Sequence, residues 1–537
     1  MKRISILLAG LSLMAMALSC KQPVPGQVKV TGGWIQGEVT EDMCIYKGIP
    51  FAAPPVGDLR WKAPQPVIPW DGIREAKEFG PGPVQGFGFP GQSNSEDCLY
   101  LNLWSPAKSP KNKMPVLVWI YGGGFSMGSS SQYDGRPLAE KGVILVTINY
   151  RVGQLGYFVY PELSAEDPHH VSGNYGILDQ IAALQWVHDN IAAFGGDPKN
   201  VTIFGESAGG ISVSMLCASP LAKGLFQRAI SQSGGSFGPV RRNSYPGENM
   251  KTLAMAEQDG VKYAEGLGAG SLAELRAMDA GAFARQMVVT GGAWPIVDGY
   301  VIPDDQYRMY EAGNFNDVDV LIGYNSDEGA SFGATKDPVE HVRATEERYG
   351  PYAEKLLEAY PLGDSPVVPK SARDLGRDAS FGWHTWSWAR LQSERSSKNV
   401  YMYYFDQHPD YPEGSPQYGN GSPHGQDVDY VFKSLRRETV PTDYALSDMM
   451  ATYWTNFAKT GDPNGEGLPE WPKFTRDNHV TMVLTGDKPH PSAVPDEDAM
   501  WVLNSYFEWR RSPEGAAWAE AKHYASGYAV PFIPCIK

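Results

Sequence analysis

A short apolar stretch, a glycine-flanked serine and a run of small residues follow one another within residues 201–216. Val201 to Phe204 is apolar and rich in β-branched residues, which is typical of a buried parallel strand. Gly205-Glu206-Ser207-Ala208-Gly209 then fits the pattern G-x-S-x-G, in which a serine occupies a sharp turn between a strand and a helix. The small residues from Ala208 to Gly210 allow a helix to begin close against that strand. This order predicts a sheet of parallel strands with helices packed on it.

Three other serines match the same pattern, because the chain contains 59 glycines: Ser126, Ser236 and Ser331. The context of each differs from that of Ser207. Further serines and Gln132 follow Ser126, and prolines soon follow the other two. None of these stretches is typical of the start of a helix, so we interpret them as glycine-rich loops. Ser207 is therefore the candidate nucleophile.

A nucleophile of this kind needs backbone N–H groups that bind the oxyanion formed during acyl transfer. The N–H of Ala208, directly after the serine, is one candidate. A second source is the run Tyr121-Gly122-Gly123-Gly124, which directly follows an apolar strand predicted at 116–120. Consecutive glycines let several N–H groups converge where side chains would block the approach. The alternative interpretation of this run is a turn without such a role.

A candidate acid follows another predicted strand, Asp319 to Gly323. Asp327 and Glu328 lie just beyond its carboxyl end, where sheets of this kind place site residues. The two carboxylates are adjacent in the chain and so point in different directions. The residue pattern by itself leaves both open.

Seven of the ten histidines follow this acid in the chain, and only some suit a catalytic base. His424 lies in a glycine-rich loop, 419–425, from which an imidazole could reach across a site. His384 lies in the aromatic stretch from Trp383 to Trp388 and is expected in the core. Four others are expected at the surface: His408, His479, His490 and His523. The pattern favours His424 without excluding the others.

Taken together, these motifs resemble those of the type-B carboxylesterases, which include bacterial para-nitrobenzyl-type esterases and the cholinesterases. The similarity extends over almost the whole mature chain. Its markers stand in the family's order: Gly48 to Ala52, Ser95 to Asn102, Tyr121 to Phe125, Asn149 to Gly153, Asp179-Gln180, Phe194 to Pro198, the Ser207 turn, Gln232 to Gly234, Asp327 to Gly329 and His424-Gly425.

The resemblance implies an α/β-hydrolase fold, with a large, mostly parallel central sheet flanked by helices and insertions around an active-site gorge. It implies a serine carboxylic-ester hydrolase that forms an acyl-enzyme, needs no cofactor or metal and acts on small-molecule esters. The implied roles are a catalytic triad of Ser207, Glu328 and His424, oxyanion donors at Gly123, Gly124 and Ala208, a pocket residue Glu206, a serine near the triad at Ser233, and structural ion pairs Arg60–Glu96 and Arg151–Asp179. The alternatives are a lipase acting on longer acyl chains and a non-catalytic cholinesterase-like binding protein.

The N-terminus has the layout of an export signal. Met1-Lys2-Arg3 and an apolar stretch to Leu18 predict a signal peptide at 1–19. Ser19-Cys20 resembles a loose bacterial lipobox, so we expect lipidation of Cys20, a lipid-anchored tether at 20–27 and a single enzyme domain at 28–537. The expected location is the bacterial periplasm or cell envelope, and the alternative is plain secretion. We expect contact with a membrane only through this anchor.

Cysteines and charge add weaker expectations. Family members often close a disulfide at the position of Cys98, but Pro83 and Val84 stand where its partner is expected. A Cys44–Cys98 pair is an option, Cys217 is expected to be a free core thiol, and the pairing of Cys535 is open. The net charge of −15 argues against nucleic-acid binding. Further expectations are a helix-rich segment at 238–292, small residues at 290–293 that leave a roomy acyl pocket, an amphipathic helix at 447–459, and a polar, non-metal loop at His169-His170.

Overall fold

The computed structural model describes residues 24–521, except 90, 241–244, 246, 285–293, 333–334, 416, 436–440 and 487. An eleven-stranded sheet in the order β16-β15-β14-β13-β12-β11-β9-β10-β8-β4-β3 forms its centre. The seven strands that run from β15 to β10 in this order, β9 included, all pair in parallel with their neighbours. The outer pairs β10–β8, β8–β4, β4–β3 and β15–β16 are antiparallel. The predicted mostly parallel sheet of the α/β-hydrolase fold is confirmed.

The strands of the central sheet are β3 (Glu38–Val39), β4 (Cys44–Pro50), β8 (Tyr100–Ser105), β9 (Met114–Ile120), β10 (Ile144–Ile148), β11 (Gly196–Glu206), β12 (Arg228–Gln232), β13 (Asp319–Asn325), β14 (Val400–Phe405), β15 (Val480–Leu484) and β16 (His490–Ala493). A smaller sheet contains β1 (Gln27–Val30), β2 (Gly33–Gln36) and β5 (Ile73–Glu75), and a two-stranded one β6 (Gly82–Pro83) and β7 (Asn94–Ser95).

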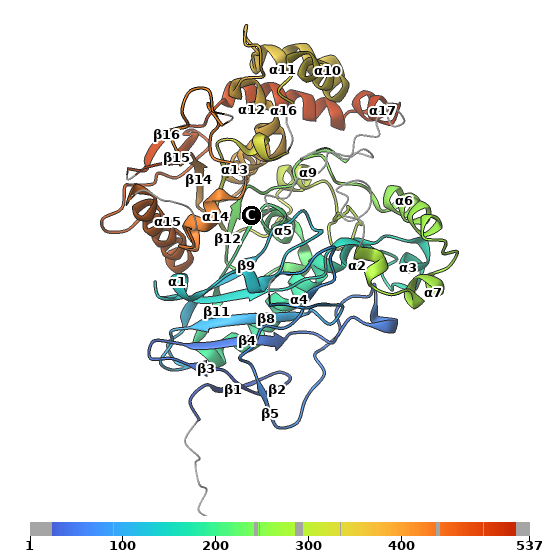
Figure 1. Cartoon of the computed structure of the whole chain (residues 1–537), viewed down its shortest axis with the longest axis vertical. Helices are drawn as coiled ribbons and strands as arrows, with labels where there is room; N and C mark the ends of the chain where they lie inside the picture. The colour runs from blue at the N-terminus through green and yellow to red at the C-terminus, as the bar shows by residue number, and fades with distance from the viewer. Residues whose placement is uncertain are drawn as a thin grey trace, which may run out of the picture.

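Helices flank the central sheet, and α10, α11 and α17 lie at the opposite end of the molecule from β1, β2 and β5 (Figure 1). The helices are α1 (Arg136–Ala139), α2 (Gly153–Tyr157), α3 (Pro161–Glu166), α4 (Tyr175–Asn190), α5 (Ala208–Ala218), α6 (Leu253–Gly266), α7 (Leu272–Ala277), α8 (Gly281–Ala284), α9 (Gln306–Glu311), α10 (Pro338–Tyr349), α11 (Ala353–Ala359), α12 (Lys370–Arg377), α13 (Trp383–Arg395), α14 (Gln426–Val431), α15 (Pro441–Thr460), α16 (Glu497–Arg511) and α17 (Pro513–Ala521).

The strands predicted from apolar runs are present as β9, β11 and β13, and each is longer than its apolar run. Val116 to Ile120 is completely buried, as expected for a parallel strand covered on both faces. The aromatic residues at 383–388 lie buried in α13, and the amphipathic helix expected at 447–459 is part of α15.

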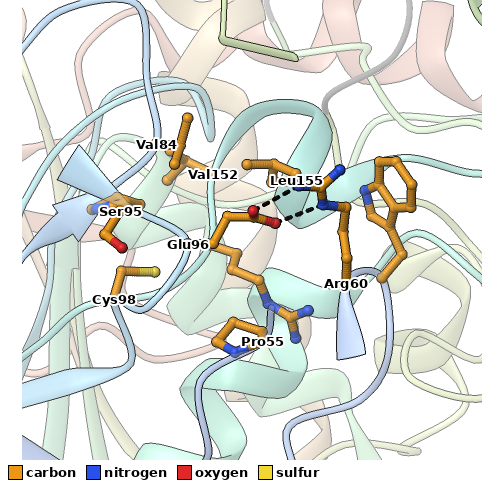
Figure 2. A pocket seen from close by; sticks show the side chains of 11 residues that line it. Pro55, Arg60, Val84, Ser95, Glu96, Cys98, Val152 and Leu155 are labelled. Atoms are coloured by element: carbon orange, nitrogen blue, oxygen red, sulfur yellow. Dashed lines mark hydrogen bonds and ion pairs between the residues drawn. The ribbon is translucent and has the colours of Figure 1, made fainter. Parts of the chain in front are cut away.

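Between Ser207 and the candidate acid, the helix-rich segment forms α6, α7 and α8, which share a second apolar cluster with Trp61, Leu155 and Phe158. Arg60 ties this segment to the sheet domain. Its guanidinium forms two hydrogen bonds with Glu96, at 2.6 and 2.7 Å (Figure 2). Its Nη1 also donates to backbone carbonyls at the end of α7. Both predicted ion pairs are confirmed, since Arg151 Nη2 lies 2.7 Å from Asp179 Oδ1 in the core.

The Cys44–Cys98 pair that the sequence allowed does not form, because Cys44, Cys98 and Cys217 are all free thiols. Cys44 is paired with Ser105 at one end of the β4–β8 ladder, whereas Cys98 lies beyond the other end, next to Tyr100. Six residues of strand separate those ends, roughly 20 Å at 3.3 Å per residue. Val84 lines the same small cavity as the Cys98 thiol (Figure 2) and offers it no sulfur partner.

The expected signal peptide, Cys20 and Cys535 lie outside the described residues. Of the tether expected at 20–27, residues 24–27 form a turn in which the Gln27 N–H donates to the Val24 carbonyl at 3.0 Å. Within the described part of the chain, no helix combines the length and apolar character needed to cross a bilayer.

We expect Gly209→Ala to destabilise the fold, because a Cβ there would stand 2.0 Å from the Ile120 carbonyl oxygen. Such overpacking against backbone should lower the free energy of unfolding by about 2–3 kcal/mol. Gly266→Ala is the control, since nothing lies within 4 Å of its Cβ position, and it should stay within about 1 kcal/mol of the parent. Urea unfolding of the two variants measures the difference, and equal midpoints would contradict the close packing.

Candidate active site

Ser207 lies at the turn between β11 and α5 in a strained backbone conformation, with φ 55° and ψ −124°. Glycines make this turn feasible, because a Cβ at Gly205 would stand 2.5 Å from the backbone of Gly209, and one at Gly210 would stand 2.7 Å from the Gln232 carbonyl. The Ser207 N–H donates to that same carbonyl at 3.0 Å. Strain of this kind persists only where the surrounding structure enforces it. Here it places the serine just beyond the carboxyl end of β11.

Glu328 and His424 are joined by a hydrogen bond, with 2.5 Å between Glu328 Oε2 and His424 Nδ1. The other oxygen, Oε1, accepts from the Ser233 hydroxyl at 2.5 Å and from the Asn325 N–H at 2.7 Å. Glu328 is completely buried. Its carboxylate therefore has a fixed orientation and directs the imidazole's Nε2 to the opposite side.

Asp327, the adjacent carboxylate, turns away from this pair. Its Oδ2 lies 3.2 Å from the Arg373 guanidinium and accepts the Gly421 N–H at 3.1 Å. Asp327 thus holds the loop that carries His424. The structure separates the two carboxylates that the residue pattern left open.

Two residues that sequence reasoning did not assign to the site hold His424 in place, one through its ring and one through its backbone. Phe381 stacks on His424, with ring centroids 4.7 Å apart and planes at 15°. Phe381 lies in a π-helical turn, Asp378–Gly382, directly before α13. Ser331, interpreted as part of a glycine-rich loop, accepts a hydrogen bond from the backbone N–H of His424 at 3.1 Å through its hydroxyl oxygen. Its closeness in sequence to Glu328 was the only available signal.

Glu206 faces the imidazole from the side opposite Glu328, with 3.3 Å between Glu206 Oε1 and His424 Nε2. Burial raises the pKa of Glu206 to about 8. Burial also lowers the pKa of His424, but the charges of Glu206 and Glu328 and the Glu328 hydrogen bond outweigh this effect, so the pKa is raised overall. A neutral Glu206 removes one of these charges and so favours the neutral imidazole.

The glycine loop lies against the serine. A Cβ at Gly122 would stand 3.0 Å from the Ser207 Cβ and 2.6 Å from the Glu206 carbonyl. Gly123 and Gly124 have φ values of 113° and 60°, which other residues adopt only with strain. Ala208 is the first residue of α5, so its N–H has no acceptor within the helix. These three N–H groups lie at the same edge of the sheet as Ser207.

A buried polar cluster behind the serine also escaped the sequence analysis. Asp427 Oδ2 accepts from Gln232 Nε2 and from the Tyr403 hydroxyl, both at 2.8 Å. Gln232 Oε1 in turn accepts from Trp454 Nε1 at 3.0 Å. Because the backbone carbonyl of Gln232 receives the Ser207 N–H, this cluster fixes the strand that supports the turn. Asp427 lies three residues after His424, which was the one sequence signal for it.

The other late histidines that the sequence analysis weighed and the structure describes have their contacts elsewhere. His384 is completely buried, accepts the Phe237 N–H at 3.0 Å, and burial lowers its pKa to about 3. His479 is half-buried beside Glu497, and His408 is also half-buried. His490 is exposed. His523 and the small residues at 290–293 expected to shape an acyl pocket lie outside the described residues.

We expect Glu206→Gln to lower the pKa of the His424 imidazole. The carboxylate stabilises the imidazolium, so its removal favours the neutral ring, and the titration should move to lower pH. NMR titration of isotope-labelled histidine measures this shift. Glu75→Gln, which removes an exposed carboxylate on β5, is the control and should leave the titration unchanged. An unchanged or raised pKa in Glu206→Gln would contradict the proposed charge effect.

Comparison with known proteins places this arrangement in a family. Residues 24–498 match the model of the "Carboxylesterase family". The fumonisin B1 esterase of Sphingopyxis macrogoltabida is 36% identical over 505 residues, covering 88% of each chain. Mouse carboxylesterase 1E is 36% identical, covering 89% of this chain and 92% of the relative.

Solved structures agree with this assignment. A PNB esterase is 33% identical, with a TM-score of 0.76, covering 89% of this chain and 99% of that one. The Geobacillus stearothermophilus carboxylesterase EST55 gives the same identity, TM-score and coverage. The chain therefore belongs to the carboxylesterase family and is a type-B carboxylesterase.

Proposed function

We propose that the protein hydrolyses carboxylic esters through a Ser207–Glu328–His424 triad and an acyl-enzyme intermediate. The main support is the strained turn at Ser207, whose neighbour Glu206 lies 3.3 Å from an imidazole already paired to a buried carboxylate. The glycine loop against the serine supplies the remaining component, a group of N–H donors for an oxyanion. A non-catalytic binding protein would have no need for this complete set.

In the first half-reaction, the Ser207 oxygen attacks the ester carbonyl carbon while His424 Nε2 takes the hydroxyl proton. The carbonyl oxygen becomes an oxyanion, which the N–H groups of Gly123, Gly124 and Ala208 stabilise. Loss of one such donor typically costs about 10²–10³ in rate. The carbon–oxygen bond to the alcohol then breaks, and the alcohol leaves with the proton from His424.

In the second half-reaction, water attacks the acyl-Ser207 ester and His424 accepts the water proton. Collapse of the second oxyanion releases the acid, and the proton returns to the Ser207 oxygen. Glu328 remains ionised throughout, holding the imidazole in one tautomer through Nδ1 and stabilising its charged form. Ser233 and the Asn325 N–H keep this carboxylate in place.

We expect Ser207→Ala to lower kcat for a nitrophenyl ester by about 10⁴- to 10⁶-fold, because the acyl-enzyme can no longer form. An organophosphate should label the parent once, and peptide mass spectrometry should locate the label on Ser207. Ser236→Ala is the matched control, since Ser236 fits the same G-x-S-x-G pattern outside the β11–α5 turn. Equal rates in the parent and Ser207→Ala would overturn the proposed nucleophile.

We propose soluble esters as substrates, because the relatives described above are named as esterases and carboxylesterases. The rate with short-chain esters should saturate below their solubility limit. A triglyceride emulsion should give no abrupt rise when an interface appears. Such a rise would favour the alternative, a lipase of longer acyl chains. Fumonisin B1 belongs in the same substrate panel because a relative is named for its hydrolysis.

We further propose that the protein is exported and anchored through a lipid on Cys20. The support is the sequence alone, with a charged start, an apolar stretch and Ser19-Cys20 at its end. The expected location is the periplasm or cell envelope, and plain secretion is the alternative. Incorporation of labelled palmitate into the parent, and its loss in Cys20→Ala, tests this proposal.

A further inference from the structure

The small sheet of β1, β2 and β5 has one face packed on the protein and one face exposed. Ile35 on the inner face is completely buried and belongs to the main core. Lys29, Trp34 and Ile73 are cross-strand neighbours on the outer face, because Lys29 pairs with Trp34 and Trp34 pairs with Ile73. Trp34 is 45% exposed and Ile73 is 51% exposed. We call this row the Trp34 face.

Two further exposed apolar side chains lie where the chain enters this small sheet. Val24, the first described residue, is 50% exposed, and Val39 is 48% exposed. Val39 adjoins the turn that precedes β1, since a Cβ at Gly26 would stand 2.7 Å from Val39 Cγ2. Exposed Glu75 on β5 pairs with Lys77, and exposed Glu38 and Asp71 lie close in the chain to Val39 and Ile73. The Trp34 face itself is apolar, with Lys29 in the same row.

The Trp34 face is held rigidly on the rest of the molecule. Asn190, at the end of α4, accepts from the N–H and the hydroxyl of Thr31 in the β1–β2 turn, at 2.8 and 2.9 Å. Trp70 covers the same turn, and its Nε1 donates to the Trp34 carbonyl at 2.9 Å. The exposed row is thus a fixed part of the surface, at one end of the long axis (Figure 1).

The chain enters this small sheet directly from the proposed anchor. The Pro25 carbonyl accepts from Gln36 Nε2 at 3.0 Å, and the Gly37 N–H donates to the Gly26 carbonyl at 2.9 Å, so the chain is attached to the sheet from residue 25 onward. Only four peptide steps separate Cys20 from Val24. Fully extended, they span about 14 Å. A lipid on Cys20 would therefore keep Val24, at the turn that leads into β1, within about 14 Å of the bilayer.

We propose that the Trp34 face lies in the interfacial region of the membrane to which Cys20 is anchored. This inference rests on the proposed lipid anchor and adds an orientation to it. Tryptophan and apolar side chains favour the boundary between headgroups and acyl chains, and a lysine beside them reaches the headgroups. The partner is a lipid surface.

The test uses the full-length lipoprotein, reconstituted into phosphatidylcholine vesicles with brominated acyl chains, which quench tryptophan fluorescence on contact. Trp34→Phe is compared with Trp501→Phe, because Trp501 on α16 is 43% exposed, almost the same as Trp34. We expect the bromolipid-quenched part of the emission to fall by at least half in Trp34→Phe. It should be retained in Trp501→Phe. Hydrolysis of a soluble ester should be unchanged in both variants, which checks that they fold.

Each other outcome overturns a defined part of the proposal. A parent protein that takes up no palmitate overturns the anchor and, with it, the basis for this orientation. A palmitate-bearing protein whose quenching is unaffected by Trp34→Phe overturns the orientation alone. If that variant instead turns a dimer into a monomer in sedimentation experiments, the Trp34 face contacts a second copy of the chain and the lipid assignment is wrong.

Discussion

The close approach of α5 to the central sheet is the constraint on which the candidate active site depends. Side chains at Gly205, Gly209 or Gly210 would collide with backbone atoms at 2.0–2.7 Å, so the helix reaches this position only because those residues are glycine. That contact forces Ser207 into its strained conformation, places the free N–H of Ala208 at the start of the helix, and brings Glu206 and the Gly122 loop alongside. The positions of the proposed nucleophile, oxyanion donors and pocket carboxylate are therefore consequences of one packing arrangement.

Buried carboxylates and their partners determine the arrangement of the side chains around His424. Four carboxylates lie close together around it, and each has different partners. Glu328 is bound to His424 and Ser233, Asp327 to Arg373, and Asp427 to Gln232 and Tyr403. Glu206 Oε1 accepts no hydrogen bond among the described residues, and burial raises its pKa. The carboxylates with partners give the imidazole a fixed orientation, while Glu206 is the one whose protonation can adjust the charge on His424.

The contacts that attach the peripheral segments to the central sheet involve other residues than the candidate active site. Arg60 and Arg151 join the α6–α8 segment and the α4 region to the sheet through ion pairs remote in sequence from the triad. The small sheet of β1, β2 and β5 is attached through Asn190 and Trp70 at one end of the molecule. Such rigid attachments leave its outer face, with the exposed Trp34 and Ile73, available for a different contact.

The sequence by itself determined the local elements. Apolar runs predicted β9, β11 and β13, and the glycines predicted the turn at Ser207, because these features depend on short-range sterics and on burial of both faces of a strand. Only the tertiary structure decided how His424 faces Glu328 and Glu206, which lie 96 and 218 residues away in the chain. The residue pattern could not choose between Asp327 and Glu328, because the choice depends on Arg373 and Ser233 from other elements. Phe381, Ser331 and Asp427 were missed for the same reason, since their contacts with the site exist only once the chain has folded.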